Sequence, residues 1–269
     1  MHSIRNLSFI LACGVLLGPL KADAQTIFFL DHNPNAVFQV DPDTGDRAYF
    51  SNGSNWGGGP NIVFGQFIDI DPTGDFWVSD LSLDALFHID GTTGERTIIS
   101  DATTGSGPTF VDIRGMAYGS PTVVYISDPG NQALYGVHPV TGDRTLISGD
   151  GTGNGTGFLS PLGLDVDSDG TILVVDPSVA AIFRVDPATG DRTIVSGAST
   201  GVGEALTQTR SIAIESNGDL IVSGTTRVIR VSLPTGDRMI VSGPGIGNGP
   251  EFQFMSSVIV DSDGSLLMT

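Results

Sequence analysis

A short motif recurs five times along the chain at nearly constant spacing. Each copy ends in Thr-Gly-Asp-Arg or Thr-Gly-Glu-Arg, and the arginines are Arg47, Arg96, Arg144, Arg192 and Arg238. Successive arginines lie 49, 48, 48 and 46 residues apart. A repeat of this length indicates one supersecondary unit used several times, each copy burying its apolar faces against its neighbours.

Residues 162–196 show the content of one unit. They contain four short β-rich runs, at 164–167, 171–176, 181–186 and 192–196. The segments between the runs contain Asp-Gly and Pro-x-x-Gly sequences, which favour tight turns because glycine adopts positive φ and proline presets the first turn position. No unit has helical periodicity. The sequence therefore predicts an all-β fold in which each unit is a four-stranded blade of a β-propeller.

The number of blades depends on how the chain ends combine. Four complete units run approximately over 66–100, 114–148, 162–196 and 210–242. Thr26 begins a second strand, and residues 256–269 supply a first strand and most of a second. Joining both ends gives a fifth blade and removes free sheet edges, so we expect five blades. Residues 265–269 and 26–30 align to the same strand, so six blades is the alternative if the chain continues.

The first 24 residues have the pattern of a secretory signal peptide. Arg5 is followed by an apolar stretch over 7–20 and by the cleavage sequence Ala22-Asp23-Ala24. The alternative is a membrane anchor, for which the apolar stretch is short. We therefore expect a secreted or periplasmic protein in which residues 25–269 form a single propeller domain.

The composition is strongly acidic. The chain has 30 acidic residues against 12 Lys and Arg, a net charge of −18 and a pI of about 4.2. Removal of residues 1–24 leaves no cysteine, arginine as the only cationic side chain and a charge of about −19. This charge argues against nucleic-acid partners and anionic membranes, and it favours a monomer. No later segment is long and apolar enough to span a bilayer.

The pattern of residues 163–176, GLDVDSDGTILVVD, and its copies resemble NHL-type repeats. More broadly they resemble gluconolactonase-like propellers of the calcium-dependent phosphotriesterase superfamily. The resemblance covers nearly all of the chain after residue 24 and implies the fold, but such propellers include both enzymes and binding modules. In gluconolactonase-like enzymes Glu and Asn side chains hold a calcium ion in the channel, and virginiamycin B lyases depend on a His and a Glu. This sequence has no residue-by-residue match to either motif.

The positions just before each first strand break the repeat. They are Gln66, Arg114, Leu162, Arg210 and Ser256. If the first strand is innermost, these residues ring one mouth of the central channel, where two arginines are suited to a carboxylate or a phosphate. The alternative is that each arginine pairs with a nearby acid. The candidate ligand-binding residues are Gln66, Arg114, Arg210 and Ser256.

An aspartate ends the second strand of four units. These residues are Asp31, Asp80, Asp128 and Asp176, with Gly224 in the fifth unit. Such an aspartate caps a loop by accepting backbone N–H bonds. A ring of acids around the channel would instead suit a cation, so these four are the candidate ligands for Ca²⁺.

The remaining motifs have structural interpretations. The acidic turn at 165–170 is read as a hairpin, because no distant Glu completes a calcium loop. The Gly-rich segment 149–157 is a connector, since no helix follows as in a dinucleotide site. The repeated arginines are expected to pair with a carboxylate or carbonyl of the next blade. Three histidines, His32, His88 and His138, occupy different registers and predict neither a histidine metal site nor a catalytic triad.

Two functions are compatible with these features. The first is a secreted binding module that takes a small molecule, glycan or protein at the channel mouth or on the Gly-rich loops. The second is a calcium-dependent hydrolase, lactonase or lyase with its site in the channel. An enzyme should bring repeat-breaking acids, amides or histidines together around the channel. The regularity of this sequence favours the binding module.

Overall fold

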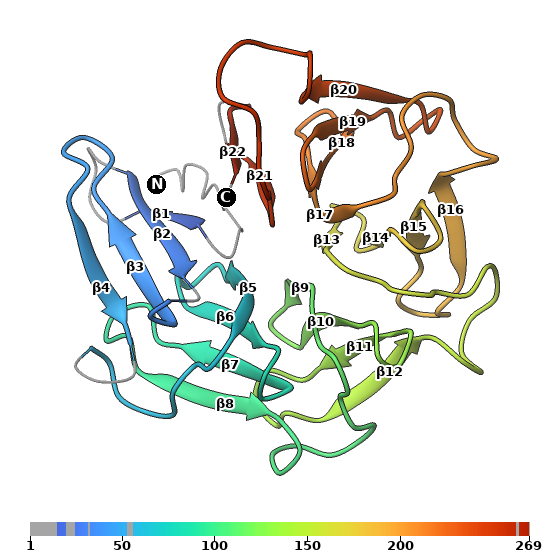
Figure 1. Ribbon diagram of the computed structural model, residues 1–269. Coiled ribbons are helices and arrows are strands. Elements are labelled where there is room, and N and C mark those ends of the chain that lie inside the picture. The colour runs from blue at the N-terminus through green and yellow to red at the C-terminus, as the bar shows by residue number, and fades with distance from the viewer. Residues whose placement is uncertain (1–14, 20–24, 32, 53–55, 262–263, 269) are drawn as a thin grey trace, which may run out of the picture.

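The computed structural model describes residues 15–19, 25–31, 33–52, 56–261 and 264–268. Within them, twenty of the twenty-two strands form five four-stranded antiparallel sheets. The sheets are arranged around a common axis like the blades of a propeller (Figure 1). The prediction of an all-β propeller with five four-stranded blades is therefore confirmed. None of the described residues belongs to a helix that is long and apolar enough to cross a membrane.

Each blade consists of four consecutive strands, the first innermost and the fourth outermost (Figure 1). Blade 1 contains β1 (Val15–Pro19), β2 (Gln25–Asp31), β3 (Ala36–Val40) and β4 (Arg47–Ser51). Blade 2 contains β5 (Gly65–Ile70), β6 (Phe76–Asp80), β7 (Ala85–Ile89) and β8 (Arg96–Ser100). Blade 3 contains β9 (Met116–Ser120), β10 (Val123–Asp128), β11 (Ala133–Val137) and β12 (Arg144–Ser148). Blade 4 contains β13 (Leu164–Val166), β14 (Ile172–Asp176), β15 (Ala181–Val185) and β16 (Arg192–Ser196). Blade 5 contains β17 (Thr209–Ile214), β18 (Leu220–Gly224), β19 (Val228–Val231) and β20 (Arg238–Ser242).

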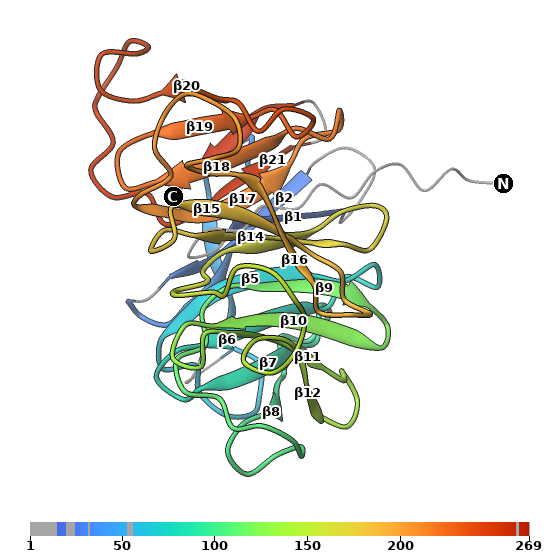
Figure 2. The ribbon, with the colours of Figure 1, turned by 90° about the vertical axis from the view of Figure 1, so that its right-hand side faces the viewer.

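The apolar core lies between neighbouring blades. The second strands of blades 2, 4 and 5 are buried along their whole length, because adjacent blades cover both of their faces. Phe28 of blade 1 packs on Phe76 of blade 2, and Leu173 of blade 4 belongs to one cluster with Val222 of blade 5. The innermost strands lie side by side around the axis, with β5 beside β9, and β13 beside β9 and β17 (Figure 1 and Figure 2).

The closure of the ring differs from the expectation that both chain ends share one blade. The C-terminal strands β21 (Val258–Val260) and β22 (Leu266–Met268) pair only with each other within the described residues. They fill the space between blade 5 and blade 1 (Figure 1), and β21 packs along β17 and β18. The inner edge of β2 is instead paired with β1. The reason is that β2 and β22 are both second-strand sequences and cannot occupy the same position.

The predicted signal peptide overlaps blade 1. Strand β1 lies inside the segment 1–24, of which residues 1–14 and 20–24 are outside the described residues. Cleavage before Gln25 stays a prediction. If it occurs, β1 leaves with the signal peptide and the inner edge of β2 becomes available to another strand.

The repeated arginines join each blade to the one before it. Arg144, at the start of β12, is almost fully buried. Its Nε donates to the carbonyl of Pro108 at 2.6 Å, and its Nη1 donates to Ser100 Oγ at 2.6 Å. Ser100 ends blade 2, and its hydroxyl donates back to the Gly142 carbonyl at 2.8 Å. The arginine therefore bonds carbonyls and a hydroxyl of the connector and the preceding blade, whereas a partner on the next blade was expected.

The same contact recurs at three other blade interfaces. The Arg–Ser pairs are Arg96 with Ser51, Arg192 with Ser148 and Arg238 with Ser196. Each serine hydroxyl also donates to the carbonyl of the glycine two residues before the arginine. We call this unit of arginine, serine and carbonyls the arginine clamp.

The Gly-rich connectors lie directly on the clamp. Gly153 and Gly155 have φ values of 75° and 102°. A Cβ on Gly153 would lie 1.8 Å from the Gly190 carbonyl oxygen, and one on Gly155 would lie 2.1 Å from that of Arg192. Only glycine allows both the left-handed backbone and this approach. This agrees with the structural interpretation of the segment 149–157.

We expect Arg144→Ala to destabilise the protein by about 3 kcal/mol, because it leaves a buried hydroxyl and several carbonyls without a donor. Arg47→Ala is the matched control, since Arg47 has the same motif position but is exposed. Urea unfolding of both variants measures the difference. Equal stability of the two variants would contradict the role assigned to the clamp.

Candidate functional site

The predicted mouth residues lie at one end of the innermost strands. Gln66 and Arg210 lie near the start of β5 and β17, and Arg114 precedes β9. Neighbouring blades are bonded to each other there: Ser127 Oγ of β10 donates to the Leu162 carbonyl at 2.6 Å, and Gly163 N donates to the Arg210 carbonyl at 2.9 Å. These positions therefore share one end of the innermost strands, which we call the mouth, and a binding role there stays a prediction. Ser256 lies in the same register before β21.

Arg114 and Arg210 are close enough to interact electrostatically, although they come from blades 3 and 5. Burial lowers the pKa of Arg210, and the positive charge of Arg114 lowers it further. Arg114 Nε pairs with Asp112 Oδ1 at 2.9 Å, and both side chains are 32% exposed. The Arg210 guanidinium lies over the Phe254 ring, 4.5 Å from its centroid. Asp80 and Asp128 hold connectors of the same face, so the positive charge is local to the two guanidinium groups.

The connectors that lead to the innermost strands carry exposed apolar side chains. Val63, Val111 and Leu159 occupy equivalent positions in three connectors and are 44%, 56% and 53% exposed. Phe254, in contact with Arg210, is 62% exposed. Clustered exposed apolar residues on a soluble protein mark binding surfaces more often than single ones do. We call these four residues the apolar rim.

The strand-end aspartates hold the connectors of this same face. Asp80 is fully buried, and its Oδ2 accepts the backbone N–H groups of Val63 at 2.6 Å and Phe64 at 3.0 Å. Its Oδ1 accepts those of Ser82 and Leu83. Asp128 and Asp176 make equivalent bonds to their own connectors. These are the contacts of a loop cap.

The predicted role of these four aspartates as calcium ligands is not supported by a neighbouring ligand among the described residues. Asp31 Oδ1 accepts the Asn33 N–H at 2.9 Å, as expected for the same cap. Among the described residues, none of the four aspartates belongs to a group of acids and histidines close enough to share an ion. Their calcium role therefore stays a prediction.

Two other carboxyls, Asp69 and Asp165, lie on the innermost strands β5 and β13. Asp69 Oδ2 accepts the Tyr118 N–H at 2.7 Å, and Asp165 Oδ2 accepts the Ile214 N–H at 3.1 Å. Each carboxylate therefore accepts a hydrogen bond from the backbone of the first strand of the following blade. Burial raises the pKa of Asp69 to about 7 and that of Asp165 to about 6, and the charge of Asp165 raises the pKa of Asp69 further.

Sequence reasoning missed the axial position of Asp69 and Asp165, because it treated both as parts of acidic turns. The available signal was a break in the repeat. The same register holds Ala117, Ala213 and Ile259 in the other units. An acid at an apolar inner-strand position is an exception that a register alignment of the repeats would have revealed.

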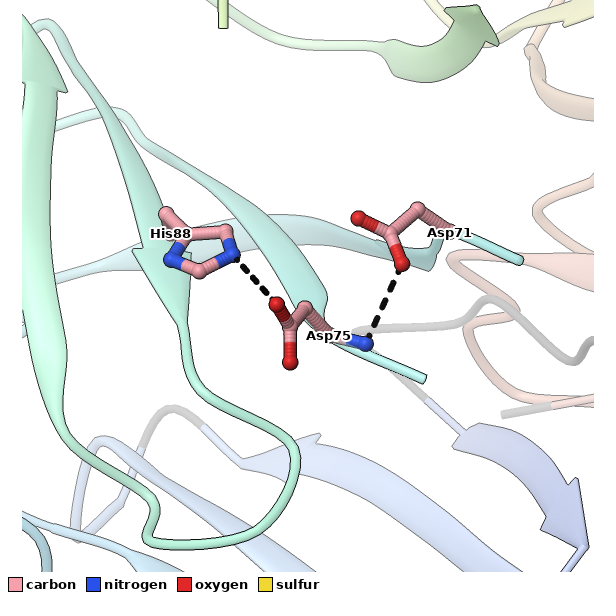
Figure 3. A group of neighbouring side chains, drawn as sticks. All are labelled: Asp71, Asp75 and His88. Carbon is pink, nitrogen blue, oxygen red and sulfur yellow. Dashed lines mark hydrogen bonds and ion pairs between the residues drawn. The ribbon is translucent and has the colours of Figure 1, made fainter. Parts of the chain in front are cut away.

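A third group lies at the opposite end of β5, on blade 2 (Figure 3). Possible ligand atoms of Asp71, Asp75 and His88 all lie within 4.8 Å of one another. His88 Nε2 is 3.1 Å from Asp75 Oδ2, with side chains 25% and 30% exposed. Trp77 Nε1 donates to Asp71 Oδ2 at 3.2 Å. Sequence analysis compared the histidines only with each other and so missed this meeting of one histidine with two aspartates.

Comparison with known proteins gives the fold and no closer relationship. No protein-family model matches the chain, and no curated protein matches it. Solved structures do match over most of its length. A gluconolactonase from Xanthomonas campestris aligns over 99% of this chain and 96% of its own, with a TM-score of 0.66 and 13% identity.

Two further solved structures show how varied the proteins of this fold are. A virginiamycin B lyase from Staphylococcus aureus aligns over 96% of this chain and 77% of its own, with a TM-score of 0.64 and 14% identity. The structure of a nidogen/laminin complex includes a chain with a TM-score of 0.61 and 15% identity, covering 87% of this chain and 80% of that one. The chain therefore shares the propeller fold with gluconolactonase-like, lyase and protein-binding structures.

The raised pKa of Asp165 predicts a pH dependence of stability. Because the folded-state pKa is about 6 against an ordinary 3.8, folding favours the protonated carboxyl. The stabilisation of the fold by the protonated Asp165 carboxyl is fully present below pH 3.8 and is lost as the pH rises through about 6. We expect Asp165→Asn to lose less stability than the wild type between pH 4 and pH 7, by at most about 3 kcal/mol.

Asp191→Asn is the control of opposite sign, because hydrogen bonds from Asn154 hold the pKa of Asp191 low. This variant should lose stability relative to the wild type as the pH rises toward 3.8, so the measurements extend below that pH. Thermal unfolding across the pH range measures both. Parallel profiles for wild type and Asp165→Asn would contradict the protonated state assigned to Asp165.

Proposed function

We propose that the protein is a secreted binding module whose ligand is a small organic anion with an apolar part, held at the arginine mouth. Two observations carry the proposal: Arg114 lies near enough for its charge to lower the pKa of Arg210, and Arg210 lies on exposed Phe254 of the apolar rim. A carboxylate or phosphate suits the planar, permanently charged guanidinium groups. The rim provides the surface on which the apolar part of the ligand lies.

The charge of the protein makes this mouth selective. With a net charge of −18, most of the surface repels an anion. Among the described residues, Asp112 forms the one ion pair at the mouth, and it engages Arg114. Arg210 instead stacks on Phe254 and forms no ion pair with a carboxylate in the part of the chain that the structure describes. An incoming anion therefore has a fixed, partly desolvated guanidinium to bind.

Secretion rests on the signal-peptide pattern of residues 1–24. The regular repeat of the blades supports a binding role. The nidogen/laminin structure supports a protein ligand as one outcome of ligand screening. The mouth geometry favours a small anion over a protein, because its two arginines form a compact charged centre.

A hydrolase or lyase acting on the axis is the second candidate. It is supported by Asp69 and Asp165, two repeat-breaking carboxyls on inner strands, and by the gluconolactonase and lyase structures of the same fold. Paired carboxyls in different environments are able to divide acid and base roles.

Asp69 and Asp165 do not form a suitable calcium site. Calcium takes about six to eight oxygen ligands. Asp69 and Asp165 each already accept two backbone N–H groups, those of Ile70 and Tyr118 and those of Val166 and Ile214. We therefore derive no catalytic step through calcium.

Calorimetric titration with alkyl and aryl carboxylates and their matched neutral amides tests the binding proposal. We expect the carboxylates to bind at least about tenfold more tightly than the amides, because only they pair with guanidinium. Arg210→Gln should weaken carboxylate binding by about tenfold or more. Arg184→Gln is the matched control. Arg184 lies on β15, the third strand of blade 4, and pairs with Asp167 and Asp169.

Equal binding of acids and amides, or equal effects of both arginine variants, would contradict the proposal. Hydrolysis of a lactone or ester in the same panel would support the second candidate if Asp165→Asn abolishes it and Arg184→Gln does not.

A further inference from the structure

We propose that blade 2 carries a binding site for a divalent transition-metal ion such as Zn²⁺, formed by His88, Asp75 and Asp71. The site lies at the end of β5 opposite the arginine mouth and is independent of the proposed anion binding (Figure 3).

The backbone brings the three ligands together. Asp71 and Asp75 flank the tight turn between β5 and β6, where Asp71 N donates to the Asp75 carbonyl at 2.9 Å. His88 enters from β7, in which it is the cross-strand partner of Trp77 on β6. The register of three antiparallel strands therefore fixes the positions of the three side chains.

The distances suit a shared ion. His88 Nε2 and Asp75 Oδ2 lie 3.1 Å apart. With metal–ligand bonds of about 2.1 Å, this separation corresponds to a ligand–metal–ligand angle of roughly 95°. One ligand atom from each of the three residues lies within 4.8 Å of the other two, so an ion between them would draw Asp71 closer against its hydrogen bonds from Thr73 and Trp77. The side chains of His88 and Asp75 are about one quarter exposed, which allows water to complete the coordination.

Other groups hold the carboxylates in place. Gly91 N donates to Asp75 Oδ1 at 2.8 Å, which leaves Oδ2 directed at His88. Trp77 Nε1 donates to Asp71 Oδ2, while Thr73 donates to Asp71 Oδ1. Such outer hydrogen bonds orient the ligands of protein metal sites. One imidazole with two carboxylates is a donor set that suits zinc, cobalt or manganese better than calcium, which prefers oxygen alone.

The other blades supply an independent argument. In the register of His88, blade 4 has Arg184 and blade 5 has Arg230. Arg184 pairs with Asp167 at 3.2 Å, and Arg230 binds Glu215 through two bonds of 2.6 and 2.8 Å. Asp167 and Glu215 occupy the register of Asp71. These blades thus place a permanent positive charge between the third strand and the first hairpin.

Blade 2 keeps the carboxylates but replaces the arginine with histidine. Two negative groups then face an imidazole that is able to bind a metal when neutral. A divalent cation would supply the positive charge that arginine provides in blades 4 and 5. This comparison distinguishes the group from a cluster of acids on an acidic surface.

The test is titration of the chelator-treated full chain with Zn²⁺ and with Co²⁺, whose visible absorption reports an imidazole-containing site. We expect one ion per chain. His88→Arg is the informative variant, because it installs the residue that blades 4 and 5 use and should preserve the fold. It should weaken metal binding by at least about tenfold, as should Asp75→Asn.

His138→Gln is the matched control and should bind as the wild type does, because His138 lies on an exposed hairpin of blade 3. Circular dichroism verifies that every variant is folded. No saturable binding by the wild type, or several weak sites that His88→Arg leaves unchanged, would overturn the proposal. Retained binding in His88→Arg with loss in His138→Gln would overturn it as well.

Discussion

The arginine clamp is the contact on which the rest of this propeller depends. A blade cannot bury its apolar faces alone, so each must be fixed to its neighbour at a defined angle. Arg144 achieves this by bonding the end of the preceding blade and the connector at once. The buried charge is balanced by carbonyl oxygens and a serine hydroxyl and needs no carboxylate. The connectors must then lie on the clamp, which explains glycines such as Gly153 and Gly155.

A regular frame of this kind makes its exceptions informative. Arginines at the mouth, carboxyls on the inner strands and a histidine in place of an arginine each break the repeat at a separate level of the molecule. The two ends of β5 consequently present different side chains. The mouth brings together Arg114 and Arg210, whereas the other end presents Asp71 and Asp75. The proposed anion site and the proposed metal site would therefore lie at opposite ends of β5, and each is formed by residues that depart from the repeat.

The repeat was sufficient to predict the strands, the turns and the number of blades, because these follow from local patterns within one unit. The shared register of Arg114 and Arg210 beside the first strands also followed from the repeat. Ring closure did not, since the choice between β1 and the C-terminal strands depends on competition between distant segments. The meeting of His88 with Asp75 depends on register between β6 and β7, which no local pattern states.

Hydrogen–deuterium exchange of the full chain, with and without a saturating aryl carboxylate, tests the location of the proposed anion site most directly. The account predicts slower exchange in the connector segments 61–66, 109–114, 206–210 and 252–256, which carry the mouth and its rim. Exchange in the hairpin 71–75 should be unchanged. Protection confined to that hairpin, or no protection at saturation, would contradict the assignment of the mouth as the binding surface.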